Sequence, residues 1–166
     1  MLLVDKNIKE LVKNGLLIVT NYKEENVTPI SYDLTIDCIV KEDENKTEHI
    51  LKPKEFVMIK TNEELQIPNN ILGRIGEKNS LMRMGLCVSG PHYQPGHRTY
   101  CYLRVYNMSD KEITLKRNLK IAQIIFEMLQ EVPNLTYDKI EKSSFNNEKS
   151  YLGFGKYTDE YKKIIK

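Results

Sequence analysis

The residues of this sequence best suited to chemistry lie close together, at Lys78, Asn79, Ser80 and Arg83. Two cations, an amide and a hydroxyl in so short a segment can bind an anion such as a phosphate, particularly where the backbone amides of a turn point toward it. The same side chains also fit a solvated or salt-bridged surface, and the Ser80 hydroxyl also fits a turn cap. Taken by themselves these residues favour the surface, so a phosphate site needs further support.

General motifs for catalysis and metal binding are absent from the sequence. It contains no Gly-x-x-x-x-Gly-Lys-Ser/Thr loop, no Gly-x-Gly-x-x-Gly loop and no Gly-x-Ser-x-Gly nucleophile elbow. It also lacks the His-x-Glu and Pro-Cys-x-x-Cys pair of zinc deaminases. The histidines and cysteines are not spaced as metal ligands, so we expect no metal site. These residues are His49, His92, His97, Cys38, Cys87 and Cys101.

Composition and charge narrow the class of protein. A length of 166 residues with 40% hydrophobic and 29% charged residues suits one globular domain. The net charge of +2, from 25 basic and 23 acidic residues, is too even for a nucleic-acid binder. Apolar runs such as 121–126 are far below the roughly 18 residues that span a bilayer, and the early charges at Asp5 and Lys6 argue against a signal peptide. We expect a cytoplasmic protein with reduced cysteines and no membrane partner.

Short strands separated by turns must position these side chains. Residues 5–14 predict an amphipathic helix, with Asp5 as its N-cap and Gly15 after its end. Residues 31–40 alternate apolar and polar side chains, as a half-buried strand does. The pattern favours a mostly-β fold, an antiparallel barrel or sandwich with a short N-terminal helix. Further strands are expected at 56–60, 71–75, 101–106, 112–115 and 121–126, and a helical turn or two at 79–84.

Several segments of the chain match, in order, the motifs of one known family. Gly73–Leu86 reads GRIGEKNSLMRMGL and is similar to the signature G-R-x-x-x-R-S-S-L-A-R-x-G-L of dCTP deaminases. Pro29–Leu34 is similar to the P-x-S-Y-D-L strand of that family, and Leu51–Phe56 to its L-x-P-G-E-F segment. The sequence therefore resembles the dCTP deaminase/dUTPase superfamily from its N-terminus to about Phe126. The other matching positions are Val4–Lys9, Pro95–Gly96, Leu103, Asn107 and Ile121–Gln123.

The resemblance implies a dUTPase-like antiparallel fold assembled as a homotrimer, with a nucleotide held between subunits. It also implies that Lys78, Asn79, Ser80 and Arg83 bind phosphates, and it adds Gln123 to the ligand-binding residues. Lys78 stands where the family has an arginine, so it keeps the charge but loses the two-pronged hydrogen bonding of a guanidinium. We expect binding to need no cofactor, whereas an enzymatic reaction would use Mg²⁺ with a nucleoside triphosphate.

Two further differences from the family lie at the positions of its catalytic carboxylates. Its strand after Pro-Gly ends in Leu-Glu, and that glutamate activates the attacking water, but here Leu103 is followed by Arg104. The aspartate that precedes Pro-Gly is replaced by Gln94. A guanidinium stays protonated and an amide cannot take a proton, so neither residue can act as a general base. We assign both to ligand binding, and the changed segment 90–93 leaves the preferred base open.

The C-terminal segment predicts a flap. We expect a β domain over residues 1–142 and a tail over residues 143–166. Residues 149–156 resemble the flaps of the superfamily, and a Phe between two glycines suits a segment that closes and stacks on a base. Docking of this hydrophobic end on a neighbouring subunit is an equal alternative. The predicted flap residues are Tyr151, Phe154 and Lys156.

The sequence supports three hypotheses about function. The first is a catalytically inactive protein that binds or sequesters a nucleotide, or a cyclic nucleotide signal, in an intersubunit pocket. The second is an active dCTP deaminase or dUTP diphosphatase with rearranged catalytic residues, and its obstacle is the missing general base. The third is a scaffold that uses the trimer and binds no nucleotide. The residues at positions 94 and 104 favour the first hypothesis.

Overall fold

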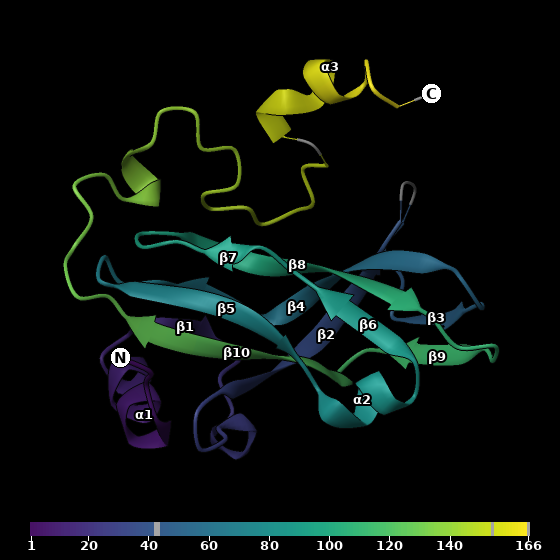
Figure 1. Ribbon diagram of the computed structural model, residues 1–166, viewed down its shortest axis with the longest axis horizontal. Coiled ribbons are helices and arrows are strands. Elements are labelled where there is room, and N and C mark those ends of the chain that lie inside the picture. The colour runs from purple at the N-terminus through teal and green to yellow at the C-terminus, as the bar shows by residue number, and fades with distance from the viewer. Residues whose placement is uncertain (42–43, 154, 166) are drawn as a thin grey trace.

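A computed structural model describes residues 1–41, 44–153 and 155–165, and strands dominate it (Figure 1). Helix α1 (Asp5–Lys13) precedes them, as predicted. Asp5 is its first helical residue rather than its N-cap, because the backbone is still extended at Val4 and the Val4 amide donates to the Asn7 side chain. The strands are β1 (Leu17–Thr20), β2 (Tyr32–Val40), β3 (Glu48–Leu51), β4 (Phe56–Gln66), β5 (Ile71–Glu77), β6 (Leu86–Ser89), β7 (His92–Tyr93), β8 (Arg98–Asn107), β9 (Ile113–Lys116) and β10 (Lys120–Met128).

The large sheet is antiparallel at every pairing between its described strands. Its order is β6-β8-β4-β2-β10-β5-β7, β1 pairs with β4, and β3 and β9 form a separate ribbon. This confirms the predicted mostly-β antiparallel fold. Among the described residues, no helix has the length and apolar character needed to cross a membrane. The other helices are η1 (Glu24–Asn26), α2 (Asn79–Arg83), η2 (Tyr137–Lys139), η3 (Gly155–Tyr157) and α3 (Thr158–Tyr161).

The alternation of residues along β8 determines which of its side chains reach the surface. Cys101, Leu103 and Val105 point into the core and are fully buried, because alternate residues of a strand face opposite sides of the sheet. Tyr102 and Arg104 therefore lie on the other side, which we call the outer face, where Tyr102 is half-buried and Arg104 is exposed. The position of Arg104 thus follows from the apolar residues on either side of it.

The chain after β10 folds back over this outer face (Figure 1). We call residues 131–153 the tail segment. The amide of Tyr137 donates to the carbonyl of Pro95 (2.8 Å), and the amide of Asn147 donates to the carbonyl of Arg98 (2.6 Å). Glu148 pairs with Thr99 in an isolated parallel bridge. These contacts come from both sides of residue 142, and the domain boundary predicted there stays a prediction.

Candidate functional site

The predicted phosphate segment forms the start of α2, with Lys78 at the N-cap position. Asn79, Ser80 and Arg83 are exposed, and the Arg83 Nε donates to Asn79 Oδ1 (3.1 Å) one turn earlier. Backbone amides in the first turn of a helix lack partners within the helix, so such a turn can accept an anion. The segment presents donors and an exposed cation, but within one chain it does not enclose a ligand.

Lys78 is paired with an acid. Its Nζ lies 2.6 Å from Asp33 Oδ1, and the Nζ of Lys120 lies 3.5 Å from Asp33 Oδ2. Asp33 is only 6% exposed, and a buried carboxylate is tolerated because such partners compensate its lost hydration. Gln123 lies opposite Asp33 in the register of β10 and β2. Lys78 and Gln123 therefore both lie beside Asp33, while Asn79, Ser80 and Arg83 are the more accessible donors.

Arg104 lies on the outer face of β8, opposite Met58 of β4 and Ser89 of β6. Its guanidinium has no hydrogen bond or ion pair with the rest of the described chain. Nearby, the Glu77 carboxylate accepts a hydrogen bond from the Val88 amide (2.8 Å). The pKa of the Cys87 thiol is raised by its hydrogen bond to Glu77 and by burial, and Arg104 partly offsets this. Arg104 is thus an unpaired cation available to an anionic ligand.

Residues 90–97 connect the paired strands β6 and β8 and position Gln94, and we call this connection the hairpin. Gly96 has φ +81°, a conformation that favours glycine, and an added Cβ would collide with Asp138 of the tail segment. The amide of His97 donates to the carbonyl of Gln94 (3.0 Å) and closes the turn. Gln94 is exposed and lines a cavity beneath the tail segment. The close approach of turn and tail therefore shapes one wall of that cavity.

This aromatic cavity has a volume of about 290 Å³ and lies between the hairpin, the outer face of β8 and the tail segment. Its size is near the lower end of the roughly 300–1,000 Å³ typical of small-molecule sites. Flat aromatic walls suit a planar ligand, because nucleobases stack on such rings. The walls belong to Tyr93, Tyr100, Tyr102, Tyr137, Phe145 and Tyr151.

Three polar side chains of the aromatic cavity have buried atoms without hydrogen-bond partners. His97 Nε2 bonds to the carbonyl of Phe145 (2.9 Å), and burial lowers the pKa of His97, so the ring is neutral at pH 7 and Nε2 is the donor. His97 Nδ1 and the hydroxyls of Tyr93 and Tyr102 have no partner within the described residues. A buried unpaired polar atom costs about 1–3 kcal/mol. A ligand or a water that pairs with them would therefore stabilise the closed tail.

Glu148 is the acidic residue of the aromatic cavity. It is 7% exposed, and its Oε1 accepts a hydrogen bond from the Leu152 amide (2.9 Å). Burial raises the pKa of Glu148, and the bond from Leu152 offsets part of that effect. The described lysines and arginines form no ion pair with it. The cavity therefore contains a carboxylate whose charge is not balanced by the described part of the chain.

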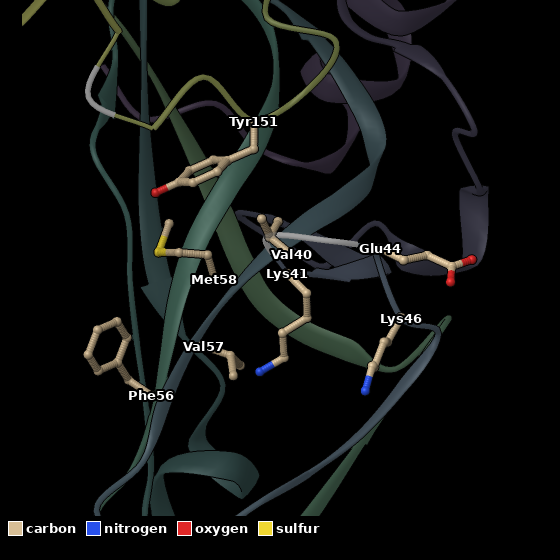
Figure 2. Close-up of a pocket in the computed structure, with 8 residues that line it drawn as sticks. All are labelled: Val40, Lys41, Glu44, Lys46, Phe56, Val57, Met58 and Tyr151. Carbon is tan, nitrogen blue, oxygen red and sulfur yellow. The ribbon is translucent and has the colours of Figure 1, made fainter. Parts of the chain in front are cut away.

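A second hollow adjoins the aromatic cavity (Figure 2). We call it the lysine groove, because Lys41 and Lys46 line it together with the acid Glu44. Met58 and Tyr151 line both hollows, and Figure 2 shows the Tyr151 ring close above Met58. The remaining lining residues are Val40, Phe56 and Val57.

Within one chain the structure brings together only part of the predicted site. Gln94 and Tyr151 line the aromatic cavity, and Arg104 lies opposite Met58, which also lines it. The α2 residues lie at another end of the sheet from β7 (Figure 1). Phe154 lies outside the described residues, and Lys156 is described only as part of the backbone of η3.

Sequence reasoning missed His97, Tyr102, Tyr137, Phe145 and Glu148. A signal was present in β8, where tyrosines occupy the outward positions that alternate with the core, and exposed aromatic surface often marks a binding site. Glu148 carries no such signal. Its place in the cavity depends on the tail segment pairing with Thr99.

The fold and its hollows define an antiparallel β protein with a hairpin-and-tail cavity suited to a small planar ligand. The family model described as dCTP deaminase-like matches residues 37–129, and the chain belongs to that family. The dCTP deaminase of Pyrococcus abyssi is 31% identical over 138 residues, which cover 78% of this chain and 85% of the relative. The dCTP deaminase, dUMP-forming, of Mycobacterium tuberculosis is 28% identical over 149 residues, which cover 75% and 78%.

Solved structures show the same fold. The 2'-deoxycytidine 5'-triphosphate deaminase of Agrobacterium tumefaciens superposes with a TM-score of 0.63 at 16% identity, covering 76% of this chain. This chain spans about half of that protein, 48% of its length. A dUTPase mutant from phage phi11 of S. aureus superposes with a TM-score of 0.53 at 16% identity, covering 75% of this chain and 90% of that one. The family match ends before the tail segment, so the residues that close the aromatic cavity lie outside it.

Proposed function

We propose that this protein binds a nucleotide in a pocket completed between copies of the chain, without the deamination chemistry of its relatives. The observation that carries the proposal is that Gln94 lines the aromatic cavity and that Arg104 lies opposite Met58, another of its lining residues. Neither side chain can remove a proton from water at neutral pH. An unpaired arginine instead favours an anionic ligand, because charge-assisted hydrogen bonds to phosphate are among the stronger ones.

The separation of α2 from the aromatic cavity supports an intersubunit pocket. The cavity offers walls for a base, and Asn79, Ser80 and Arg83 offer donors for phosphates. Within one chain, however, α2 lies apart from β7, whose residues line the cavity (Figure 1). A second copy can place its α2 against the cavity of the first. The homotrimer expected from the sequence resemblance provides such contacts by symmetry.

The second candidate function is hydrolytic deamination of dCTP, and the comparisons favour it. The relatives named above are dCTP deaminases, and their similarity extends over about three quarters of this chain. In this candidate another carboxylate must replace the family glutamate as general base. Mg²⁺ would accompany the triphosphate as part of the substrate.

One experiment separates the two candidates. The purified protein, near-stoichiometric with dCTP or dUTP and Mg²⁺, is incubated overnight and the nucleotides are resolved by ion-exchange chromatography. We expect both to remain intact while at least one nucleotide raises the melting temperature. Formation of dUTP, dUMP or pyrophosphate would show an enzyme, and failure of every nucleotide to bind would favour the scaffold.

An Arg104→Glu variant extends this test. It restores the carboxylate at the family position without changing the apolar residues on either side. If the remaining residues of the site are arranged as in an active dCTP deaminase, the variant should gain dCTP turnover that the parent protein lacks. Turnover in the parent that is lost in the variant would instead show that Arg104 itself serves catalysis.

A further inference from the structure

The Glu148 carboxylate limits the ligands that the aromatic cavity can accept. Among the described residues it accepts one hydrogen bond, from the Leu152 amide to Oε1, although an ionised carboxylate can accept about four. Burying a charge without compensation is costly. A ligand that brings N–H donors to Glu148 is therefore favoured, and a ligand that brings a lone pair is repelled.

The surrounding walls restrict the ligand further. The Tyr102 and Tyr151 rings lie 5.5 Å apart, and the His97 and Tyr137 rings lie 4.1 Å apart. Both pairs of rings line a cavity with a volume of about 290 Å³. Stacking of a base on an aromatic side chain contributes about 1–3 kcal/mol without distinguishing the bases. The choice among bases is left to the polar edge that faces Glu148.

We propose that the aromatic cavity selects guanine, with Glu148 as the residue that determines the specificity. Guanine presents two adjacent donors, N1–H and the N2 amino group, which match the two oxygens of a carboxylate. Cytosine presents a donor next to the acceptor N3, and uracil presents one N–H between two carbonyls, so each brings a lone pair toward Glu148. This inference rests on the proposed nucleotide binding and departs from the pyrimidine named in the family.

The position of Arg104 is consistent with a ligand whose base faces Glu148. It lies two residues beyond Tyr102 on the same outer face of β8, which corresponds to roughly 7 Å along a strand. A base beside Tyr102 and Glu148 thus places its sugar and phosphates toward an unpaired cation.

The Glu148→Gln substitution tests the assignment because it changes the pattern of donors and acceptors at nearly constant size. The amide introduced by this substitution offers one acceptor and one donor side by side, which matches cytosine rather than guanine. The amide oxygen can still accept the bond from Leu152, so the tail should stay in place. Glu131→Gln is the matched control, because Glu131 is exposed and lies outside the aromatic cavity.

The measurement is isothermal titration calorimetry of the full chain with dGTP, dCTP and dUTP, whose phosphates are identical. We expect dGTP to bind at least about tenfold more tightly than the pyrimidine nucleotides, and Glu148→Gln to reduce or reverse that preference while Glu131→Gln preserves it. Tighter binding of dCTP or dUTP by the parent, or an unchanged order in Glu148→Gln, would overturn the guanine assignment and leave nucleotide binding standing. Absence of binding by all three would overturn both.

Discussion

At the scale of single residues, the site is defined by charges that the protein leaves unbalanced. Arg104 has no partner among the described residues, and Glu148 has one backbone donor there. Both belong to the outer side of the sheet, where a ligand of opposite local charge would compensate them. By contrast, Lys78 is neutralised by Asp33 at 2.6 Å. Arg104 and Glu148 are thus available to a ligand, whereas Lys78 is held by an ion pair within the chain.

The pH dependence of stability provides a prediction at this scale. Burial raises the pKa of Glu148 above its usual value of 4.5, so the folded chain binds this proton more tightly than the unfolded chain. The stabilisation is fully present below pH 4.5 and is lost as the pH rises through the folded pKa. We therefore expect the parent protein to lose stability relative to Glu148→Gln over that window.

Urea denaturation of both proteins across the range from about pH 4 to about pH 8 measures this difference. The buried Glu63, whose pKa is also raised by burial, is present in both proteins and cancels. A free-energy difference between the two proteins that does not change with pH would contradict the burial of Glu148.

At the scale of elements, the turn of the hairpin and the tail segment depend on each other. Gly96 has φ +81°, and an added Cβ would meet Asp138 and Thr136. The Tyr137 amide bonds to the carbonyl of Pro95 in the same turn (2.8 Å). Seating of the tail therefore needs a residue without a side chain at position 96.

A Gly96→Ala substitution should lower the free energy of unfolding by about 1–3 kcal/mol, because it combines backbone strain with a collision. Chemical denaturation monitored by circular dichroism measures the change. Gly15→Ala is the control, because its φ is also positive (+74°) and nothing lies within 4 Å of its added Cβ. Equal losses in the two variants would mean that the contact between turn and tail does not contribute to stability.

At the scale of the whole molecule, the question is whether residues of two chains form one nucleotide-binding pocket. Complementation between two defective variants answers it. Arg83→Glu impairs the phosphate segment and Arg104→Ala removes the unpaired cation beside the aromatic cavity, so each variant alone should bind nucleotide at least about tenfold more weakly. After subunit exchange, a mixture contains interfaces with both sides intact, and binding should partly return.

Recovery of binding in the mixture, measured by calorimetry, supports a pocket between chains. Native mass spectrometry shows whether mixed oligomers have formed and how many chains they contain. Mixed oligomers without recovery of binding would place both residues in a pocket of one chain, or outside the pocket altogether.

The sequence by itself determined the mostly-β antiparallel fold and the family. Alternation along residues 31–40 and the motif of Gly73–Leu86 are local patterns, and β2, β5 and α2 lie where they predict. The orientation of Arg104 also follows from the sequence, because burial of Leu103 and Val105 turns the residue between them outward.

Only the tertiary structure revealed the aromatic cavity. Its walls come from a hairpin, from β8 and from a tail segment that follows β10 and returns to β8 by pairing Glu148 with Thr99. The sequence of the tail segment has no periodicity that predicts this pairing. The pairing consists of a few backbone hydrogen bonds and does not depend on an apolar face. The burial of Glu148, and with it the selectivity proposed for the cavity, is therefore a property of the fold rather than of any local pattern.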